Sequence, residues 1–306
     1  MSRGFKKIFI KFPIDFREPL LYNYYTMKNL EIIIKNITGE IRLSDFLKKK
    51  IGFSTSLVTK VKFGGVRLNG SVVTMRATVK NGDTIQITFP EETSENIEPI
   101  PLPLDILFED EHVLIVNKPA DMPTHPSRGN SLPTLANAAC AYLGEPFVFR
   151  AINRLDRGTS GIVIIAKNPF SAAKLGRAMK ERKINKKYIA LVSGVPTPRE
   201  DRIIAPIARE TEGNIKRVVR SDGKEAITDY KVIAEREDGN SLCEITLHTG
   251  RTHQIRVHMA YIGHPLVNDF LYGTEKNGEN YSLTCSEISF PHPRTDEIIT
   301  VKTADA

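Results

Sequence analysis

An acidic, proline-rich stretch near residue 100 most constrains how this chain can fold. Residues 91–103 contain four glutamates, three prolines and no basic residue. Proline removes a backbone hydrogen-bond donor and favours extended backbone, so such a stretch interrupts both helices and sheets. We predict an extended linker at residues 91–103. It separates a small domain, residues 28–90, from a larger one, residues 104–306.

The positive charge of the chain is concentrated on one side of that linker. The 306 residues include 43 Lys and Arg against 36 Asp and Glu, a formal net charge of +7. Residues 28–89 hold eleven basic and four acidic residues, whereas residues 104–306 are nearly neutral. A basic module attached to a neutral domain is typical of proteins that bind polyanions such as RNA.

Residues 1–27 are also basic, and we expect either a disordered arm or an upstream start codon with Met27 as the natural beginning.

Cysteine usage and hydropathy limit the class of protein. The cysteines Cys140, Cys243 and Cys285 are odd in number and widely spaced, which predicts neither a disulfide framework nor a Cys-x-x-Cys metal site. No apolar run is long enough to cross a bilayer, and the N-terminus lacks the apolar core of a signal peptide. These features favour a cytoplasmic protein that has no membrane partner.

The small domain is predicted to hold two short helices followed by strands. Ser44 and Ser54 are the expected N-caps of these helices. Their apolar faces comprise Phe46, Leu47 and Ile51 in the first helix and Leu57, Val58 and Val61 in the second. Strands are predicted over residues 66–68 and 84–89, with a tight Asn-Gly turn at residues 69–70. Four basic residues among these elements are the candidate RNA contacts: Arg42, Lys60, Lys62 and Arg67.

Strands and helices do not alternate regularly in the larger domain, which favours an α+β fold over a doubly wound sheet. The pattern of apolar residues predicts strands over residues 113–116, 162–166, 188–192 and 244–247, and helices over residues 170–182 and 251–258.

The most concentrated chemistry lies directly before one of these strands. Residues 153–161 read Asn-Arg-Leu-Asp-Arg-Gly-Thr-Ser-Gly. Asp156 thus lies between Arg154 and Arg157, whose charges favour an ionised carboxylate that can act as base or nucleophile. A serine-hydrolase elbow would need glycine at position 162, where isoleucine stands. An aspartic-protease site would need a second carboxylate of the same kind.

The histidines do not form a recognisable metal motif. His248, His253, His258 and His264 lie outside any His-Glu-x-x-His pattern, and a spacing of five residues puts His253 and His258 on different faces of a helix. We therefore expect histidines with structural or RNA-contacting roles and no metal site. The chain also lacks a Gly-rich phosphate loop, so no nucleotide cofactor is predicted.

Four segments together resemble the large-subunit rRNA pseudouridine synthase family of the RluA/RluD type. They are residues 116–120, 153–161, 187–192 and 247–258, and they occur in the family's order. Segments between residues 42 and 85 resemble the RNA-binding fold of ribosomal protein S-four. The resemblance implies that residues 104–306 form a catalytic domain on a mixed, mostly antiparallel sheet with flanking helices.

The resemblance also implies roles for individual residues. Asp156 corresponds to the catalytic aspartate, and Tyr188 to a tyrosine that stacks on the base and helps to remove the proton at carbon 5. Arg251 corresponds to an arginine that ion-pairs with the aspartate. Arg154 corresponds to the arginine that fills the stack after the uridine has flipped out, and Lys118 lies in the first matching segment as a candidate RNA contact.

The expected partner is ribosomal RNA, with transfer RNA as an alternative substrate. The isomerisation breaks a glycosidic bond and rejoins the base through carbon 5, so it needs neither metal nor redox cofactor. The resemblance favours a monomer. A different class of function also stays open, namely a non-catalytic RNA-binding or ribosome-assembly protein that has the synthase fold.

Three residues depart from the family pattern. Asn153 stands where a histidine is usual before Arg-Leu-Asp, and Asp121 and Asn268 stand where glycine is common. We expect the geometry around Asp156 to persist. The other two changes are expected to alter a turn or an RNA contact.

Overall fold

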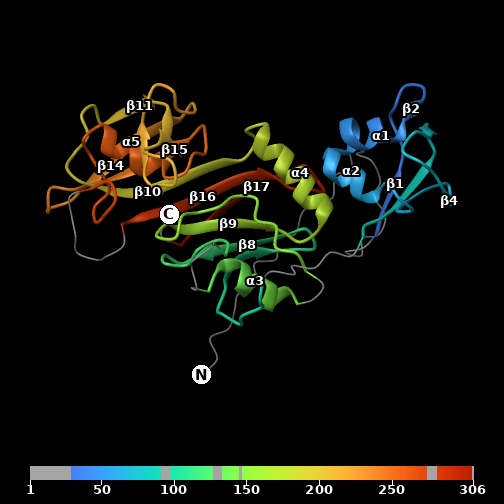
Figure 1. Cartoon of the computed structure of the whole chain (residues 1–306), viewed down its shortest axis with the longest axis horizontal. Coiled ribbons are helices and arrows are strands. Elements are labelled where there is room, and N and C mark those ends of the chain that lie inside the picture. The colour runs from blue at the N-terminus through green and yellow to red at the C-terminus, as the bar shows by residue number, and fades with distance from the viewer. Residues whose placement is uncertain (1–28, 91–96, 127–132, 145–146, 274–280, 305–306) are drawn as a thin grey trace. The chain divides into compact units, whose positions relative to one another are not determined.

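The computed structural model describes residues 29–90, 97–126, 133–144, 147–273 and 281–304. Contacts between residues divide the chain into two compact units. Figure 1 shows the chain coloured by residue number. Unit 1 holds the described residues up to 51 together with 58–90, and unit 2 holds 52–57 and the described residues from 97 onward. The predicted extension, residues 1–27, and the first half of the predicted linker lie outside the described residues. In the described parts, no helix is long and apolar enough to span a membrane.

Unit 1 combines short helical segments with a four-stranded antiparallel sheet in the order β1-β6-β3-β4. The sheet consists of β1 (Asn29–Ile33), β3 (Val66–Leu68), β4 (Ser71–Val72) and β6 (Thr84–Thr88), and a separate pair consists of β2 (Ile41–Arg42) and β5 (Thr78–Val79). The helical segments are α1 (Leu43–Asp45), a π-helical turn (Phe46–Ile51) and α2 (Thr55–Val61), whose residues up to 57 are assigned to unit 2. Asn69 and Gly70 both have positive φ, as the predicted tight turn between β3 and β4 requires.

One of the two helix caps predicted for residues 28–90 is confirmed. The Ser54 hydroxyl accepts a hydrogen bond from the Leu57 backbone N–H at 3.0 Å. The predicted cap at Ser44 is wrong, because the helix begins at Leu43 and Ser44 lies inside it. The backbone carbonyls of Ala77 and Met75 accept the N–H groups of Leu43 and Ser44, so no side-chain cap is needed there.

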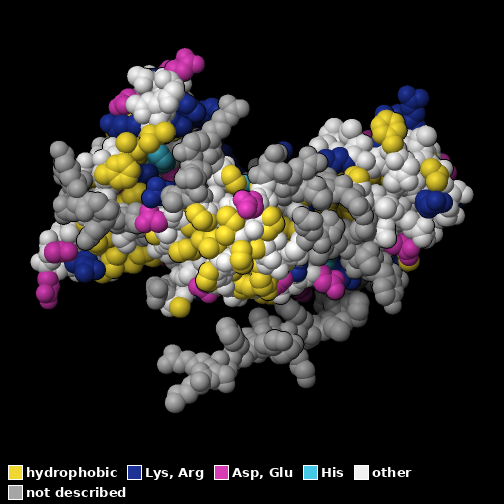
Figure 2. Space-filling view, turned by 60° about the horizontal axis from the view of Figure 1, so that its bottom comes forward, with side chains coloured by type: hydrophobic (Ala, Val, Ile, Leu, Met, Phe, Trp, Pro, Cys, Tyr) yellow, Lys and Arg dark blue, Asp and Glu magenta, His cyan; other side chains and the backbone are white. Residues whose placement is uncertain are grey.

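Basic side chains lie on the surface of unit 1. The candidate RNA contacts Arg42, Lys60, Lys62 and Arg67 are all exposed. Figure 2 shows Lys and Arg side chains at several points on the surface of this unit, at the right of the view.

Unit 2 is built on one nine-stranded sheet in the order β11-β14-β15-β10-β16-β9-β8-β7, with β17 also pairing with β16. Its strands are β7 (Asp105–Glu109), β8 (Val113–Lys118), β9 (Ser160–Ala166), β10 (Asn185–Val192), β11 (Glu200–Ile204), β14 (Ile227–Glu235), β15 (Ser241–Leu247), β16 (Leu283–Pro291) and β17 (Ile298–Lys302). A separate hairpin pairs β12 (Ile207–Arg209) with β13 (Arg217–Val219), and the helices are α3 (Leu135–Leu143), α4 (Pro169–Lys180) and α5 (Gln254–Tyr261). Strands β9 and β16 pair in parallel while their neighbours pair antiparallel, which confirms the predicted mixed, mostly antiparallel α+β fold.

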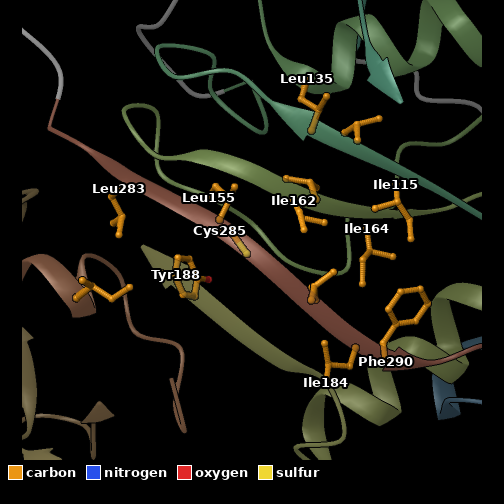
Figure 3. Packing of buried hydrophobic residues seen from close by; sticks show 14 of the residues in the cluster. Ile115, Leu135, Leu155, Ile162, Ile164, Ile184, Tyr188, Leu283, Cys285 and Phe290 are labelled. Atoms are coloured by element: carbon orange, nitrogen blue, oxygen red, sulfur yellow. The ribbon is translucent and has the colours of Figure 1, made fainter. Parts of the chain in front are cut away.

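The core of unit 2 centres on β8 and β9. All residues from 113 to 116 and from 162 to 166 are fully buried. Because successive side chains of a strand point to opposite faces, complete burial means that both faces of the sheet are covered here. Leu135 of α3 belongs to the same cluster, and Figure 3 shows it above β8, with Tyr188 of β10 beside Cys285 of β16.

The parallel pairing of β9 with β16 depends on a glycine. Gly161 has φ of 107°, and a Cβ at this position would lie 2.3 Å from the Cys285 carbonyl oxygen. We expect Gly161→Ala to lower the free energy of unfolding by roughly 2–4 kcal/mol, measured by urea titration followed by circular dichroism. Gly176→Ala in α4 is the matched control, since its Cβ would meet nothing within 4 Å. Equal unfolding midpoints for the two variants would contradict this explanation.

Candidate active site

A cavity of about 550 Å³ in unit 2 gathers residues from segments far apart in the sequence. Its walls come from the loop before β9, from β10, from the end of β15 and from the turn leading into α5. Four of the predicted site residues line it: Arg154, Asp156, Tyr188 and Arg251. Its size lies within the range of small-molecule sites, about 300–1,000 Å³. The structure therefore brings these four predicted residues together around one cavity.

The loop that carries Asp156 is held on several sides. The Asp156 carbonyl accepts a hydrogen bond from the Thr159 N–H at 3.1 Å, which closes a tight turn. Leu155 is buried, and the Thr124 hydroxyl bridges its N–H and its carbonyl at 3.2 and 2.9 Å. On the far side of the turn, the Thr159 hydroxyl lies 3.3 Å from that of Tyr281. These hydrogen bonds hold the backbone of Asp156 in one position.

Asn153 fixes the start of this loop. It is buried, and its side-chain amide donates to the Ile162 carbonyl and accepts from the Ile164 N–H, both at 2.9 Å. Both contacts tie the loop to β9. Asn153, which stands where the resemblance expects a histidine, therefore holds the start of the Asp156 loop against β9.

The other two departures from the family pattern share one backbone feature. Asp121 and Asn268 both have φ of 64°, in the left-handed region. Glycine adopts that region at no cost, and Asp and Asn are the residues that tolerate it best among the others. The carboxylate of Asp121 also lies 3.4 Å from the Arg157 guanidinium. Both residues therefore adopt a backbone conformation that is also open to glycine.

Lys118 is placed differently from the prediction. Its side chain is fully buried, and its ammonium donates to the carbonyls of Pro119, Met122 and Arg157 at 2.8, 2.7 and 3.3 Å. Burial lowers the pKa of Lys118 to about 8, while the charges of Asp156 and Asp121 oppose that shift. An ammonium enclosed in this way braces the Asp156 loop and is not available to RNA.

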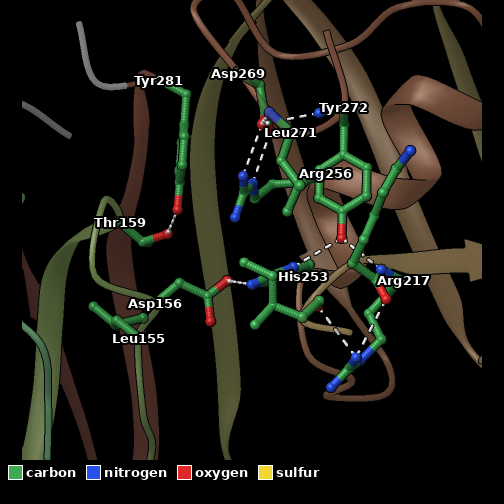
Figure 4. A network of polar contacts seen from close by, with 12 residues as sticks. Leu155, Asp156, Thr159, Arg217, His253, Arg256, Asp269, Leu271, Tyr272 and Tyr281 are labelled. Atoms are coloured by element: carbon green, nitrogen blue, oxygen red, sulfur yellow. Dashed lines mark hydrogen bonds and ion pairs between the residues drawn. The ribbon is translucent and has the colours of Figure 1, made fainter. Parts of the chain in front are cut away.

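Asp156 faces His253, and the guanidinium of the buried Arg256 lies to one side, next to Tyr281 and Asp269 (Figure 4). The Asp156 carboxylate is one-quarter exposed, and its Oδ2 lies 3.9 Å from His253 Nε2. The charge of Asp156 also favours the protonated forms of both His253 and Arg256. Asp156 is therefore the solvent-accessible carboxylate of a largely buried polar network.

The expected ion pair between Arg251 and Asp156 is absent among the described residues. Arg251 lines the cavity, but its Nε donates to the Glu225 carbonyl at 2.8 Å. The cause lies in the turn before α5, where the Arg251 N–H donates to the Gln254 side chain and the Gln254 amide donates to Ile227 of β14. This anchoring fixes the backbone so that the Arg251 side chain runs toward Glu225.

Arg256 also lines the cavity, and the sequence did not predict it as a site residue. It is buried, and Asp269 accepts its two guanidinium hydrogen bonds, both at 2.7 Å. The guanidinium lies over the rings of Tyr281 and Tyr272, at 4.2 and 5.0 Å. Burial lowers the pKa of Arg256, but the hydrogen bonds and charge of Asp269 outweigh it and raise that pKa overall. An arginine between apolar neighbours in an expected helix is a signal for such a buried partner.

The predicted helix in this region begins later than expected. Strict helix starts at Gln254, because His253 adopts a left-handed conformation with φ of 58° and ψ of 20°. That bend directs His253 into the cavity.

Two other histidines have structural contacts: His258 is buried between Thr228 and Ala205, and His264 contacts the Ser193 carbonyl. No group of residues suited to hold a metal ion occurs in the described parts of the chain.

Tyr188 presents a neutral ring to the cavity. It is 5% exposed, and its antiparallel neighbour across the strands is Cys285. Burial raises the pKa of Tyr188 well above its ordinary value, and the hydrogen bond with the Cys285 thiol adds to this. Its hydroxyl is protonated at neutral pH, and the buried ring forms part of the cavity wall.

Comparison with known proteins gives a consistent result. A family model described as RNA pseudouridylate synthase matches residues 112–261, a range that includes Asp156, Tyr188 and Arg256. An uncharacterised RNA pseudouridine synthase of Bacillus subtilis, YjbO, is 40% identical over 255 residues, which are 81% of this chain and 90% of that protein. The ribosomal large subunit pseudouridine synthase D of Xanthomonas campestris is 38% identical over 229 residues, 72% of this chain and 67% of that protein.

A solved structure extends the agreement to the fold. Human RNA pseudouridylate synthase domain containing 1 is 31% identical and superposes with a TM-score of 0.57, covering 66% of this chain and 84% of its own. With the sheet, the cavity and the sequence all in agreement, this chain belongs to the RNA pseudouridine synthase family.

Proposed function

We propose that this protein isomerises particular uridines of large-subunit ribosomal RNA to pseudouridine, with Asp156 as the catalytic carboxylate. The observation that carries the proposal is the placement of the accessible Asp156 carboxylate on a braced loop in the cavity that Tyr188 also lines. The choice of ribosomal RNA rests on the relatives named for that substrate. As a modifier of ribosomal RNA it would act in the cytoplasm, and we propose a monomer that uses no cofactor.

The chemistry assigns a role to each wall of the cavity. The target base must first leave its stack, at a cost of a few kcal/mol, and Arg154 is exposed at the cavity where it can fill the gap. The carboxylate of Asp156 then acts as nucleophile or base while the glycosidic bond breaks. The Tyr188 ring supports the detached base as it turns, and the buried Arg256 supplies the cation that the resemblance assigned to Arg251.

Mapping pseudouridines in a strain that lacks this protein tests the substrate. We expect specific sites to disappear from large-subunit ribosomal RNA and to return when the wild-type gene is restored. Sites lost only from transfer RNA would overturn the choice of substrate. If no site disappears from any RNA, the alternative of a non-catalytic RNA-binding protein gains support.

We further propose that unit 1 holds RNA through its phosphate backbone. Its exposed Arg42, Lys60, Lys62 and Arg67 would each neutralise a phosphate and release a counterion. Replacing Lys62 or Arg67 by Ala should weaken RNA binding and reduce the slope of log affinity against log salt by about 1 for each phosphate that is no longer neutralised.

Binding of labelled ribosomal RNA at several salt concentrations measures this slope. Lys302→Ala is the matched control, because Lys302 is an exposed lysine of unit 2 already paired with Glu287 at 2.9 Å. An unchanged slope for Lys62→Ala and Arg67→Ala would exclude these residues as phosphate contacts.

A further inference from the structure

His253 lies between the Asp156 carboxylate and the Tyr272 hydroxyl. Its Nδ1 lies 2.8 Å from the Tyr272 hydroxyl, and its Nε2 faces Asp156 Oδ2 at 3.9 Å (Figure 4). The Tyr272 oxygen also accepts the backbone N–H of Arg217 from β13 at 2.9 Å. A continuous path of polar contacts thus runs from the hairpin β12–β13 to the catalytic carboxylate.

The network determines which nitrogen of His253 carries the proton. Because the Tyr272 oxygen accepts from the Arg217 N–H, its own proton is free to point at His253 Nδ1. Burial raises the pKa of Tyr272 to about 12, so this proton is present at neutral pH. The alternative tautomer would turn an Nε2 lone pair toward the Asp156 carboxylate, which is unfavourable. The neutral imidazole therefore carries its proton on Nε2, aimed at Asp156.

The strained backbone at His253 supports a functional role. A left-handed residue other than glycine costs about 1–3 kcal/mol and persists only where the surrounding structure holds it. Here that conformation is what turns the ring away from the helix and into the cavity. The ring is then held edge-on against Tyr272, with centroids 5.7 Å apart.

We propose that His253 is a positioning residue, which uses its Nε2–H to orient the Asp156 carboxylate so that Oδ1 is the oxygen that meets the substrate. The inference rests on the proposed role of Asp156. Hydrogen bonds in catalytic sites commonly tighten in the reacting complex, so the 3.9 Å separation is close enough to shorten into one. Tyr272 in turn holds His253, so the hairpin β12–β13 supports the alignment of the carboxylate.

The neutral state of His253 is part of this arrangement. Burial lowers the pKa of His253, and the positive charges of Arg256 and Arg217 lower it further. The negative charges of Asp156 and Asp269 act in the opposite direction and raise it. These groups face His253 from the loop before β9, from α5, from β13 and from the loop after α5. A protonated His253 would instead bind Asp156 as an ion pair and make the carboxylate a poorer nucleophile.

Two substitutions separate the contacts of His253. The amide of His253→Asn reaches the position of Nδ1 and keeps the Tyr272 contact, and asparagine tolerates the left-handed backbone. The longer His253→Gln places an N–H where Nε2 stands and keeps the Asp156 contact. We expect the Asn variant to slow single-turnover tritium release from uridine-labelled ribosomal RNA by about 10–100-fold with little change in KM. The Gln variant should stay within about 10-fold of wild type, the value of one hydrogen bond.

The pH profile provides a measurement that a purely structural role would not change. Loss of the Tyr272 O–H donor stabilises the protonated imidazole relative to the neutral one, so Tyr272→Phe should raise the pKa of His253. Since activity requires neutral His253, the acid limb of the rate profile should move to higher pH, by about one unit for one hydrogen bond. The Phe variant keeps the ring beside Arg256.

Equal rates for the wild type and the Asn variant, or an acid limb that does not move in Tyr272→Phe, would overturn the proposal. If the wild type releases no tritium at all, the proposed function fails, and the contact is then tested by NMR titration of the histidine rings. Asp156→Asn should lower the pKa of His253, because a favourable negative charge is removed. An unchanged titration of His253 would show that the two groups are not coupled.

Discussion

Asp156→Asn is expected to reduce tritium release from RNA labelled at carbon 5 of uridine by about 10⁴-fold or more, as the loss of a nucleophile does in other enzymes. The substitution keeps the shape of the side chain but removes the charge that makes the carboxylate a nucleophile or base. The loop around it should be unaffected, because its contacts come from the backbone and from Thr124, Asn153 and Thr159. RNA affinity, measured by filter binding, should therefore stay close to that of the wild type.

Asp121→Asn is the matched control for this experiment. Asp121 is a nearby carboxylate with a half-exposed side chain, 3.4 Å from the Arg157 guanidinium, and its left-handed backbone suits asparagine equally well. We expect this variant to retain most of its activity. Wild-type rates for Asp156→Asn, or an equal loss in both variants, would remove Asp156 from the catalytic role.

Asp269→Ala should strongly destabilise unit 2. It leaves the buried guanidinium of Arg256 without its two hydrogen bonds, and a buried charge that loses its partner costs about 3–5 kcal/mol. Asp269 also accepts the N–H groups of Leu271 and Tyr272, so the loop that holds His253 should loosen at the same time. Urea unfolding should show a lower midpoint, and tritium release should fall at temperatures where the chain is still folded.

Two comparisons show whether the buried charge is the cause. In the double variant Arg256→Met, Asp269→Leu, the unpaired charge is gone, and part of the stability should return although the enzyme stays inactive. Glu200→Ala breaks the exposed pair with Lys231 and should cost less than about 1 kcal/mol. A loss at Asp269 no greater than that at Glu200 would mean that the Arg256 pair contributes no special stability.

Much of the fold could be predicted from local patterns. The apolar run after Gly161 predicted a buried strand, and residues 162–166 of β9 are completely buried. Short-range rules succeeded at Ser54 and at the Asn-Gly turn, since both depend on residues within three positions of each other. They failed at Ser44, where the N–H groups of the helix are accepted by carbonyls more than thirty residues away. A cap supplied by distant backbone leaves no trace in the local sequence.

In the candidate site, too, local features could be predicted from the sequence and long-range contacts could not. Asp156 could be found because its motif is contiguous, and its loop and strand follow directly from residues 153–166. The buried arginine of the site could not. Arg251 and Arg256 stand in one motif and are chemically alike. The first donates to the Glu225 carbonyl, whereas the buried Asp269 holds the guanidinium of the second between Tyr281 and Tyr272.

The sequence by itself determined the family, the mixed α+β architecture, the position of the candidate catalytic carboxylate and the concentration of charge before residue 90. Those features depend on residue type and on spacing along the chain. Only the tertiary structure decided that Lys118 braces a loop, that Arg256 is the buried cation and that His253 faces Asp156. Each of these depends on which groups from distant segments share a buried volume, where an unpaired charge or hydrogen-bonding group is costly.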